Sequence, residues 1–293
     1  MIIFGQLTIH SELPTDVGAN VTVTDSNGNS TTGTIGSDGF CILKLPAFQL
    51  YTIAVSNGYI SKPISMGCGE NHYVEVGLGV NNPLAIKAIL NAELETEYFE
   101  VGDQVIFKEN ETEVRFDVLE IDYRMGKYGR NIIFGRHDLL TSMQMQTTNT
   151  NAGGYGNTLV ARYLDGEYYD NLDSDLQSVI KLYDFQASQG SQTSALKNEE
   201  HKVWLPVEFN IFGGTTYAAA TERTGGNAEQ FSFFATAQNR IKNLNGAVAS
   251  WWEASPYVSN STNFCYVGTT GGPNNNGASA SLGVLPCFMI AAD

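Results

Sequence analysis

The chain has 293 residues, 42% of them hydrophobic, and its 16 basic and 31 acidic side chains give a formal net charge of -15. This length and apolar content suffice for two domains, each with a core of its own, and they exclude a disordered chain. The acidic balance opposes accumulation on nucleic-acid phosphates and on anionic lipid headgroups, so we expect neither nucleic acid nor a membrane as a partner.

The N-terminal sequence MIIFGQLTIH lacks the basic start and the long apolar run of a signal peptide. No later stretch of the sequence approaches the roughly 20 apolar residues that a membrane-spanning helix needs. We therefore expect a protein that is made in the cytosol without a signal peptide and is not inserted into a membrane.

Residues 5–78 predict short β-strands separated by turns. Apolar side chains alternate in segments 21–24 and 51–55, which places one face of each strand inward. Turn signals recur at nearly regular spacing, at Gly18-Ala19-Asn20, Ser26-Asn27-Gly28-Asn29, Asp38-Gly39 and Asn57-Gly58. We predict an all-β sandwich over residues 1–79.

A linker is predicted over residues 80–97, with a brief helix at 84–90 that follows Pro83. The second domain is expected to cover residues 98–293. It begins with a strand at 104–107 and another at 114–119, joined by a polar turn.

Two amphipathic helices are predicted in the second domain. Thr158 is placed to cap the first helix, which carries Leu159, Val160, Tyr163 and Leu164. Asp173 or Ser174 is placed to cap the second, with apolar side chains at Leu176, Val179, Ile180 and Tyr183. Short apolar pieces then follow at 203–206 and 231–234, with turns at Gly213-Gly214 and Gly225-Gly226. The second domain is therefore predicted to be α+β.

The cysteines show no CxxC spacing, and each has apolar or small neighbours that suit a buried thiol. They are Cys41, Cys68, Cys265 and Cys287. We expect no disulfide framework, although a Cys265–Cys287 bridge remains open.

The acidic stretch LDGEYYDN is a candidate glycosidase site, because such hydrolysis needs two carboxylates across the scissile bond. Asp165 and Glu167 form the candidate pair, with Asp170 and Asp173 nearby. Carboxylates at helical spacing more often form a solvated face, and we expect that here.

Other catalytic or metal-binding patterns are weak. Glu199-Glu200-His201 has no second histidine near it, and the loop Gly153-Gly154-Tyr155-Gly156 lacks a phosphate-binding motif, so we interpret it as a tight surface turn. Cys265 has no histidine after it in the chain, and no GxSxG motif occurs. We predict no catalytic residue, no metal and no cofactor.

The segment 251–290 holds two adjacent tryptophans and many Asn, Ser, Thr and Gly residues, with almost no charge. Asparagine, serine, threonine and tyrosine side chains make adaptable hydrogen bonds and stacking contacts, as in antibody binding loops. A plain Gly/Asn-rich loop fits the composition equally well.

The first domain resembles the transthyretin-like repeats related to carboxypeptidase regulatory domains, through GANVTVTD, GTIGSDGFCILKLP and YTIAVSNGY. These motifs are turn and strand signals. The resemblance implies a spacer or attachment module without a catalytic residue.

The second domain resembles a C-terminal domain that is common in tail and prophage proteins of gut-bacterial phages. The resemblance rests on VWLP (203–206), FATAQNRIK (234–242), WWEASPYVSNSTNFCYV (251–267) and GVLPCFMI (283–290), and it includes TTNTNAGGYGNT (147–158) and YLDGEYYDNLDSDLQSVIK (163–181). That domain is related in fold to C-type lectins and to formylglycine-generating enzymes. It implies a C-type-lectin-like α+β fold.

Some members of this lectin-like group are variable proteins of diversity-generating retroelements, in which asparagine codons diversify. The resemblance implies a ligand-facing set made of Tyr257, Ser259, Asn260, Thr262, Asn263, Tyr266, Thr269, Thr270, Asn274, Asn275 and Ala278. It implies a scaffold made of Trp251, Trp252, Pro256, Phe264, Gly283 and Pro286. The family has arginines where this chain has Ala254 and Leu285. Their loss either alters local packing or leaves Glu253 available to the ligand.

The resemblance thus implies a phage receptor-binding protein, located in the virion, that recognises a glycan or protein on a bacterial surface without turnover. The first domain would join other tail proteins, and the chain would form a homo-oligomer, a trimer. Two alternatives stay open: a purely structural tail or baseplate protein, and an oxidase of the formylglycine-generating type with Cys265 and Cys287 as copper ligands.

Overall fold

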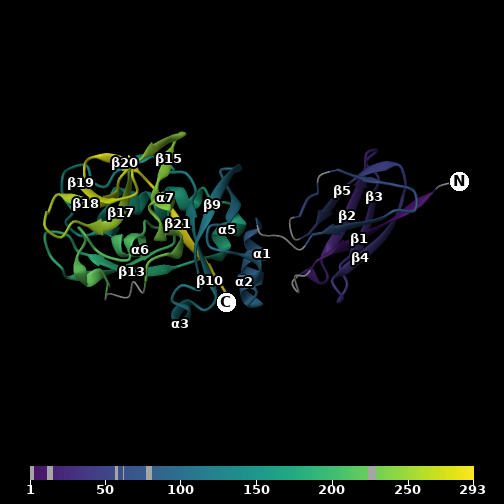
Figure 1. Ribbon diagram of the computed structural model, residues 1–293, viewed down its shortest axis with the longest axis horizontal. Coiled ribbons are helices and arrows are strands. Elements are labelled where there is room, and N and C mark those ends of the chain that lie inside the picture. The colour runs from purple at the N-terminus through teal and green to yellow at the C-terminus, as the bar shows by residue number, and fades with distance from the viewer. Residues whose placement is uncertain (1–2, 12–15, 57–58, 62, 77–80, 224–228) are drawn as a thin grey trace. The chain divides into compact units, whose positions relative to one another are not determined.

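The computed structural model describes residues 3–11, 16–56, 59–61, 63–76, 81–223 and 229–293 (Figure 1). The chain is rich in β-structure and forms two compact units, Met1–Leu94 and Glu95–Asp293. The unit boundary falls within the stretch that we predicted as a linker. The expected turns at Asn57-Gly58 and Gly225-Gly226, and the expected domain end at residue 79, lie outside the described residues.

The first unit contains two sheets that enclose one core. Their strand orders are β4-β1-β7 and β3-β2-β5-β6. The strands are β1 (Phe4–His10), β2 (Asn20–Asp25), β3 (Ser30–Thr34), β4 (Phe40–Pro46), β5 (Gln49–Val55), β6 (Ile64–Met66) and β7 (Asn71–Glu75). The predicted alternation is confirmed, because Val21 pairs with Val55 and Val23 with Ile53, and all four side chains are buried.

The brief helix after the proline is also confirmed as α1 (Pro83–Asn91). Asn82 caps it by accepting hydrogen bonds from the backbone amides of Leu84 and Ala85, at 2.9 and 3.2 Å. Pro83 occupies the first helical position, where its missing amide proton costs nothing.

The second unit contains two five-stranded sheets, with strand orders β12-β21-β10-β9-β8 and β11-β20-β17-β18-β19. The first sheet is made of β8 (Gln104–Glu109), β9 (Thr112–Ile121), β10 (Asn131–Arg136), β12 (Ile180–Lys181) and β21 (Cys287–Ala291). The second is made of β11 (Ser142–Gln144), β17 (Trp251–Pro256), β18 (Asn263–Val267), β19 (Pro273–Gly277) and β20 (Ser281–Gly283). Two further sheets have two strands each. In one, β13 (Tyr183–Ser188) pairs with β14 (Leu196–His201), and in the other, β15 (Lys242–Leu244) pairs with β16 (Ala247–Ala249).

The helices of the second unit are short. They are α2 (Glu95–Tyr98), α3 (Met125–Tyr128), α4 (Leu159–Tyr163), α5 (Ser174–Val179), α6 (Glu208–Phe212) and α7 (Ala237–Arg240), with single turns η2 (Tyr155–Asn157), η3 (Leu164–Tyr168), η4 (Ala220–Arg223) and η5 (Ser232–Ala235). Among the described residues, no helix has the length and apolar character to cross a membrane.

The caps Thr158 and Asp173 are confirmed, because each side chain accepts a hydrogen bond from a first-turn amide. The second predicted helix, however, ends at Val179. Ile180 enters β12 and pairs with β21, and Tyr183 lies in β13, where its ring stacks on Trp204 at 4.2 Å. Strand pairing and aromatic packing therefore override the helical spacing of these two residues.

Candidate functional site

The loop between β17 and β18, residues 257–262, is held from inside by one buried side chain. Asn151 has no exposed surface, and its amide nitrogen lies 3.3, 2.7 and 2.8 Å from the carbonyl oxygens of Tyr257, Asn260 and Asn263. Its two amide protons are shared among these acceptors, while its carbonyl oxygen accepts from the backbone amide of Ser191 at 2.8 Å. The side chain of Asn151 therefore ties the loop backbone to a part of the chain that lies over 100 positions earlier.

Polar side chains of this loop bond to one another. The hydroxyl of Thr262 lies 2.6 Å from Oδ1 of Asn260 and 2.7 Å from Oδ1 of Asn263, and its single proton bonds to one acceptor at a time. Asn263 in turn donates to Oδ1 of Asn275 on β19, at 2.7 Å. We call Tyr257, Ser259, Asn260, Thr262, Asn263 and Asn275 the loop surface.

Two residues outside the predicted set also contact this loop. The ring of Tyr217 meets that of Tyr257 edge to face at 5.4 Å, and its carbonyl oxygen accepts from the amide of Val258 at 3.0 Å. The exposed side chain of Gln192 donates to the carbonyl oxygen of Ser259 at 3.0 Å. Neither residue stands in a motif that single-sequence reasoning would have selected.

The rest of the predicted ligand-facing set lies elsewhere. Thr269 and Thr270 are exposed in the turn between β18 and β19, at the opposite end of β18 from the loop surface. Five strand residues separate the two ends by about 16 Å. Tyr266 and Asn274 are cross-strand partners, so they share one face of the hairpin, whereas Asn263 lies on the other face. The predicted set therefore does not form one continuous patch.

Two predicted contact residues are buried. Glu253 and Ala278 have no exposed surface, so neither side chain is available to a ligand at the surface. Glu253 lies in β17, all six residues of which are buried. The predicted scaffold residues are also buried, as are Ala254 and Leu285 at the positions of the missing arginines.

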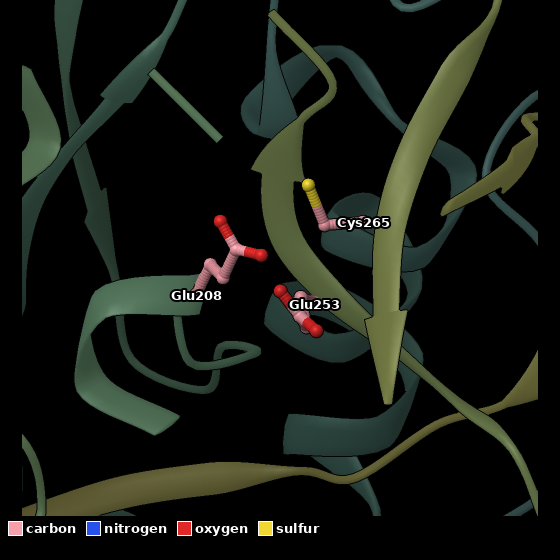
Figure 2. Close-up of side chains that lie close together, drawn as sticks. All are labelled: Glu208, Glu253 and Cys265. Atoms are coloured by element: carbon pink, nitrogen blue, oxygen red, sulfur yellow. The ribbon is translucent and has the colours of Figure 1, made fainter. Parts of the chain in front are cut away.

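Glu253 belongs to a buried group that also contains Glu208 and Cys265, which we call the acidic cluster (Figure 2). One ligand atom from each residue lies within 4.8 Å of the other two. Glu208 comes from α6, Glu253 from β17 and Cys265 from β18. Burial raises the pKa of both carboxyls and of the thiol, and the neighbouring carboxylates raise those of Glu253 and Cys265 further.

Glu208 is hydrogen-bonded to the backbone. Its carboxylate accepts from the amides of Thr216, Tyr217 and Ala218, at 2.8, 3.0 and 2.7 Å. These bonds order segment 216–218 and place Tyr217 beside the loop surface. Glu208 thereby connects the acidic cluster to the loop surface.

Residues 130–292 match the protein family described as "Domain of unknown function (DUF6273)", which covers more than half of the chain. The chain belongs to this family. A search of the curated proteins found no match. Among solved structures, "The Bacillus anthracis TIE protein" is similar at 20% identity over 25% of this chain, with a TM-score of 0.22. This chain spans 16% of the length of that one.

The loop surface, Asn151 and the acidic cluster all lie within the DUF6273 match. So do Cys265 and Cys287, which are both free and buried and belong to different sheets. The ligand groups that lie close to Cys265 are the carboxyls of Glu208 and Glu253, and Cys287 is not among them, so the structure does not bring the two thiols together as a copper pair. Cys68 is exposed, so the expectation of four buried thiols is wrong for this residue.

Two further expectations within the DUF6273 match are corrected. The Gly-rich turn at 153–156 lies only partly at the surface: Gly153 is exposed, whereas Tyr155 is fully buried and its hydroxyl accepts from the amide of Leu205 at 3.0 Å. Asp165 is not simply solvated, because its carboxylate lies 3.1 Å from Nδ1 of His201. Nε2 of His201 lies 3.4 Å from Glu199, and despite desolvation these two carboxylates raise the histidine pKa.

Glu222 gives a prediction for the pH dependence of stability. Its carboxyl is fully buried beside Ser255 and Ser188, and burial raises its pKa to about 8 from its ordinary value of 4.5. Between these pH values the unfolded chain releases a proton that the folded chain retains, so stability falls as pH rises. We expect Glu222 to contribute on the order of 3 kcal/mol to the fall in the free energy of unfolding between pH 5 and pH 8, measured in urea with EDTA present.

The control is Glu222→Gln, which keeps the shape of the side chain and removes the titrating proton. This variant should show a flatter dependence over the same range, with the remaining slope due to Glu208, Glu253 and His201, whose pKa values are also raised. Equal slopes for the variant and the parent protein would contradict the assignment to Glu222.

Proposed function

We propose that the unit Glu95–Asp293 is a ligand-recognition module and that the loop surface contacts the ligand. The observation that carries this proposal is the buried Asn151 side chain, which holds three backbone carbonyls of a loop rich in Asn, Ser, Thr and Tyr. A loop fixed before binding loses little conformational entropy when a ligand arrives. Its polar side chains then supply hydrogen bonds and its tyrosine a stacking surface.

The chemistry of the loop surface favours a ligand rich in hydroxyl or amide groups. None of its six residues carries a charge at neutral pH, so recognition rests on hydrogen bonds and ring contacts that are individually weak. Several copies acting together would raise the overall affinity, which agrees with the trimer that the sequence resemblance implies.

The wider biological role rests on the sequence resemblance alone. We propose a C-type-lectin-like fold for the second unit and a receptor-binding role on a phage tail, with a glycan or protein of a bacterial surface as ligand. The first unit would attach the chain to other tail proteins in the virion. A structural tail protein without recognition is the competing proposal, and the following experiment separates the two.

The test compares two sets of substitutions in the full chain. Tyr257→Ala with Ser259→Ala and Asn260→Ala alters the loop surface, whereas Thr269→Ala with Thr270→Ala alters exposed residues at the other end of β18. Binding of labelled protein to candidate bacterial cells should weaken by about tenfold or more for the first set, because a few central residues carry most interface energy. The second set should bind like the parent protein.

Both variants must first show the parent far-UV circular dichroism. Equal weakening by the two sets would place the contact elsewhere on the unit. Absence of binding by the parent protein to any cell tested would favour the structural role.

A further inference from the structure

The carboxyl of Glu253 has no hydrogen-bond partner. Both of its oxygens are buried, and among the described residues neither bonds to any donor or acceptor. The charges that act on it, Glu208 and Glu222, have the same sign as its own. An unpaired buried carboxylate is among the most costly groups that a fold can contain.

Protonation alone does not satisfy this group. A neutral carboxyl still has a hydroxyl donor and a carbonyl acceptor, and a buried polar group without a partner costs about 1–3 kcal/mol. Figure 2 shows the carboxyl of Glu253 beside the side chains of Glu208 and Cys265, which are themselves acidic. The arrangement is therefore suited to a positively charged occupant.

We propose that Glu208, Glu253 and Cys265 bind one divalent cation of the zinc class. Carboxylate oxygens and a cysteine sulfur together fit zinc, which accepts both donor types, better than calcium or magnesium, which take oxygen ligands. Ligand atoms of a tetrahedral zinc lie about 3.3–3.8 Å apart, as follows from zinc–oxygen distances of about 2.0–2.2 Å and a zinc–sulfur distance of about 2.3 Å. The three donors, now within 4.8 Å of one another, reach this spacing by an approach of about 1 Å.

Binding of the cation releases protons from the site. Glu253 and Cys265 lie in surroundings that favour their protonated forms, so the incoming cation displaces one proton from each. The two carboxylates offset the double charge of the cation, and the thiolate adds a third bond and leaves the occupied site with one net negative charge. Glu222 stays outside this set, because it is not part of the group whose ligand atoms lie within 4.8 Å of one another; its oxygens bond to Ser188 and Ser255. Three protein ligands leave the fourth position of zinc to water.

The cation would tie three separate elements together. Glu253 and Cys265 lie on β17 and β18, the strands that lead into and out of the loop at 257–262. Glu208 lies on α6, and its carboxylate accepts a hydrogen bond from the amide of Tyr217. Metal binding would thus stabilise the base of the loop surface. This inference concerns the interior of the unit and holds whether or not that surface binds a ligand.

The experiment is a titration of the chelator-treated full chain with Co²⁺, whose bond to a thiolate gives a charge-transfer absorption in the near ultraviolet. We expect a single ion per chain to produce this band and Zn²⁺ to displace it. Cys265→Ser should lose the band, while Cys287→Ser, which removes another buried thiol of the same unit, should retain it.

Glu253→Gln gives a second test. Glutamine has the shape of the protonated glutamate that these surroundings favour, so this variant is expected to fold. Substitution of a residue that only supports a ligand costs about 10–100-fold in metal affinity, so loss of this direct ligand should weaken Co²⁺ binding by about 100-fold or more. The absence of a thiolate band in the parent protein, or its persistence in Cys265→Ser, would overturn the proposal. Unchanged affinity in Glu253→Gln would do the same.

Discussion

Asn151→Ala is expected to destabilise the protein by about 3–5 kcal/mol and to abolish recognition by the loop surface. The substitution removes the donor shared by the carbonyls of Tyr257, Asn260 and Asn263, and the acceptor for the amide of Ser191. The carbonyls of Tyr257 and Asn263 keep backbone donors, whereas the carbonyl of Asn260 and the amide of Ser191 lose these bonds. A buried polar group left without a partner costs about 1–3 kcal/mol. Urea unfolding measures the first effect, and cell binding by the folded variant measures the second.

Asn151→Asp is the matched control for this prediction. It preserves the shape of the side chain and the acceptor for Ser191, but a carboxylate has no proton to donate and repels the loop carbonyls. It should therefore be at least as damaging as Asn151→Ala. If the aspartate variant is nearly as stable as the parent protein, the carbonyl bonds are not what holds the loop.

Lys242→Met is expected to cost about 3–5 kcal/mol of stability, because it leaves the buried carboxylate of Asp117 without its cation. Nζ of Lys242 lies 2.7 Å from Oδ2 of Asp117, and the two side chains are only 4% and 2% exposed. This pair joins β15 to β9 in the interior of the second unit. The loss is measured as a lower urea midpoint at an unchanged slope.

The double variant Lys242→Met with Asp117→Asn separates lost charge pairing from lost packing. Asparagine is neutral and is still able to bond to His137, whose Nδ1 lies 2.7 Å from Oδ1 of Asp117. The double variant should therefore recover most of the stability lost in Lys242→Met. A loss in the double variant equal to the sum of the losses in Lys242→Met and Asp117→Asn would show that the pair is not coupled.

Features of the fold that depend on neighbouring residues were predictable from the sequence. The caps at Thr158 and Asp173 and the helix after Pro83 depend on contacts within a few residues. In strands β2 and β5 of the first unit, apolar residues recur at every second position, and this pattern is visible in the sequence itself. In contrast, β19 contains Pro273, three asparagines and Gly277, a composition poor in strand formers, and it is a strand because it pairs with β18.

The candidate site was less predictable, because its decisive contacts span long distances in sequence. The hydrogen bonds of Asn151 reach residues 106 to 112 positions away, and no local pattern marks that asparagine. The burial of Glu253 was also missed. Strand β17 is buried on both faces, so it lacks the alternation that distinguishes an inward from an outward residue.

Because of the way in which Asn151 holds the loop, the loop side chains can be substituted without loss of these hydrogen bonds. The Asn151 side chain bonds to main-chain carbonyls, which every amino acid carries. These hydrogen bonds therefore do not depend on which side chains occupy positions 257–262. Substitutions at Ser259 or Ser261, which are exposed, would therefore alter the chemistry presented to solvent while leaving the path of the backbone intact. A contact of this kind allows one backbone framework to present many different sets of side chains.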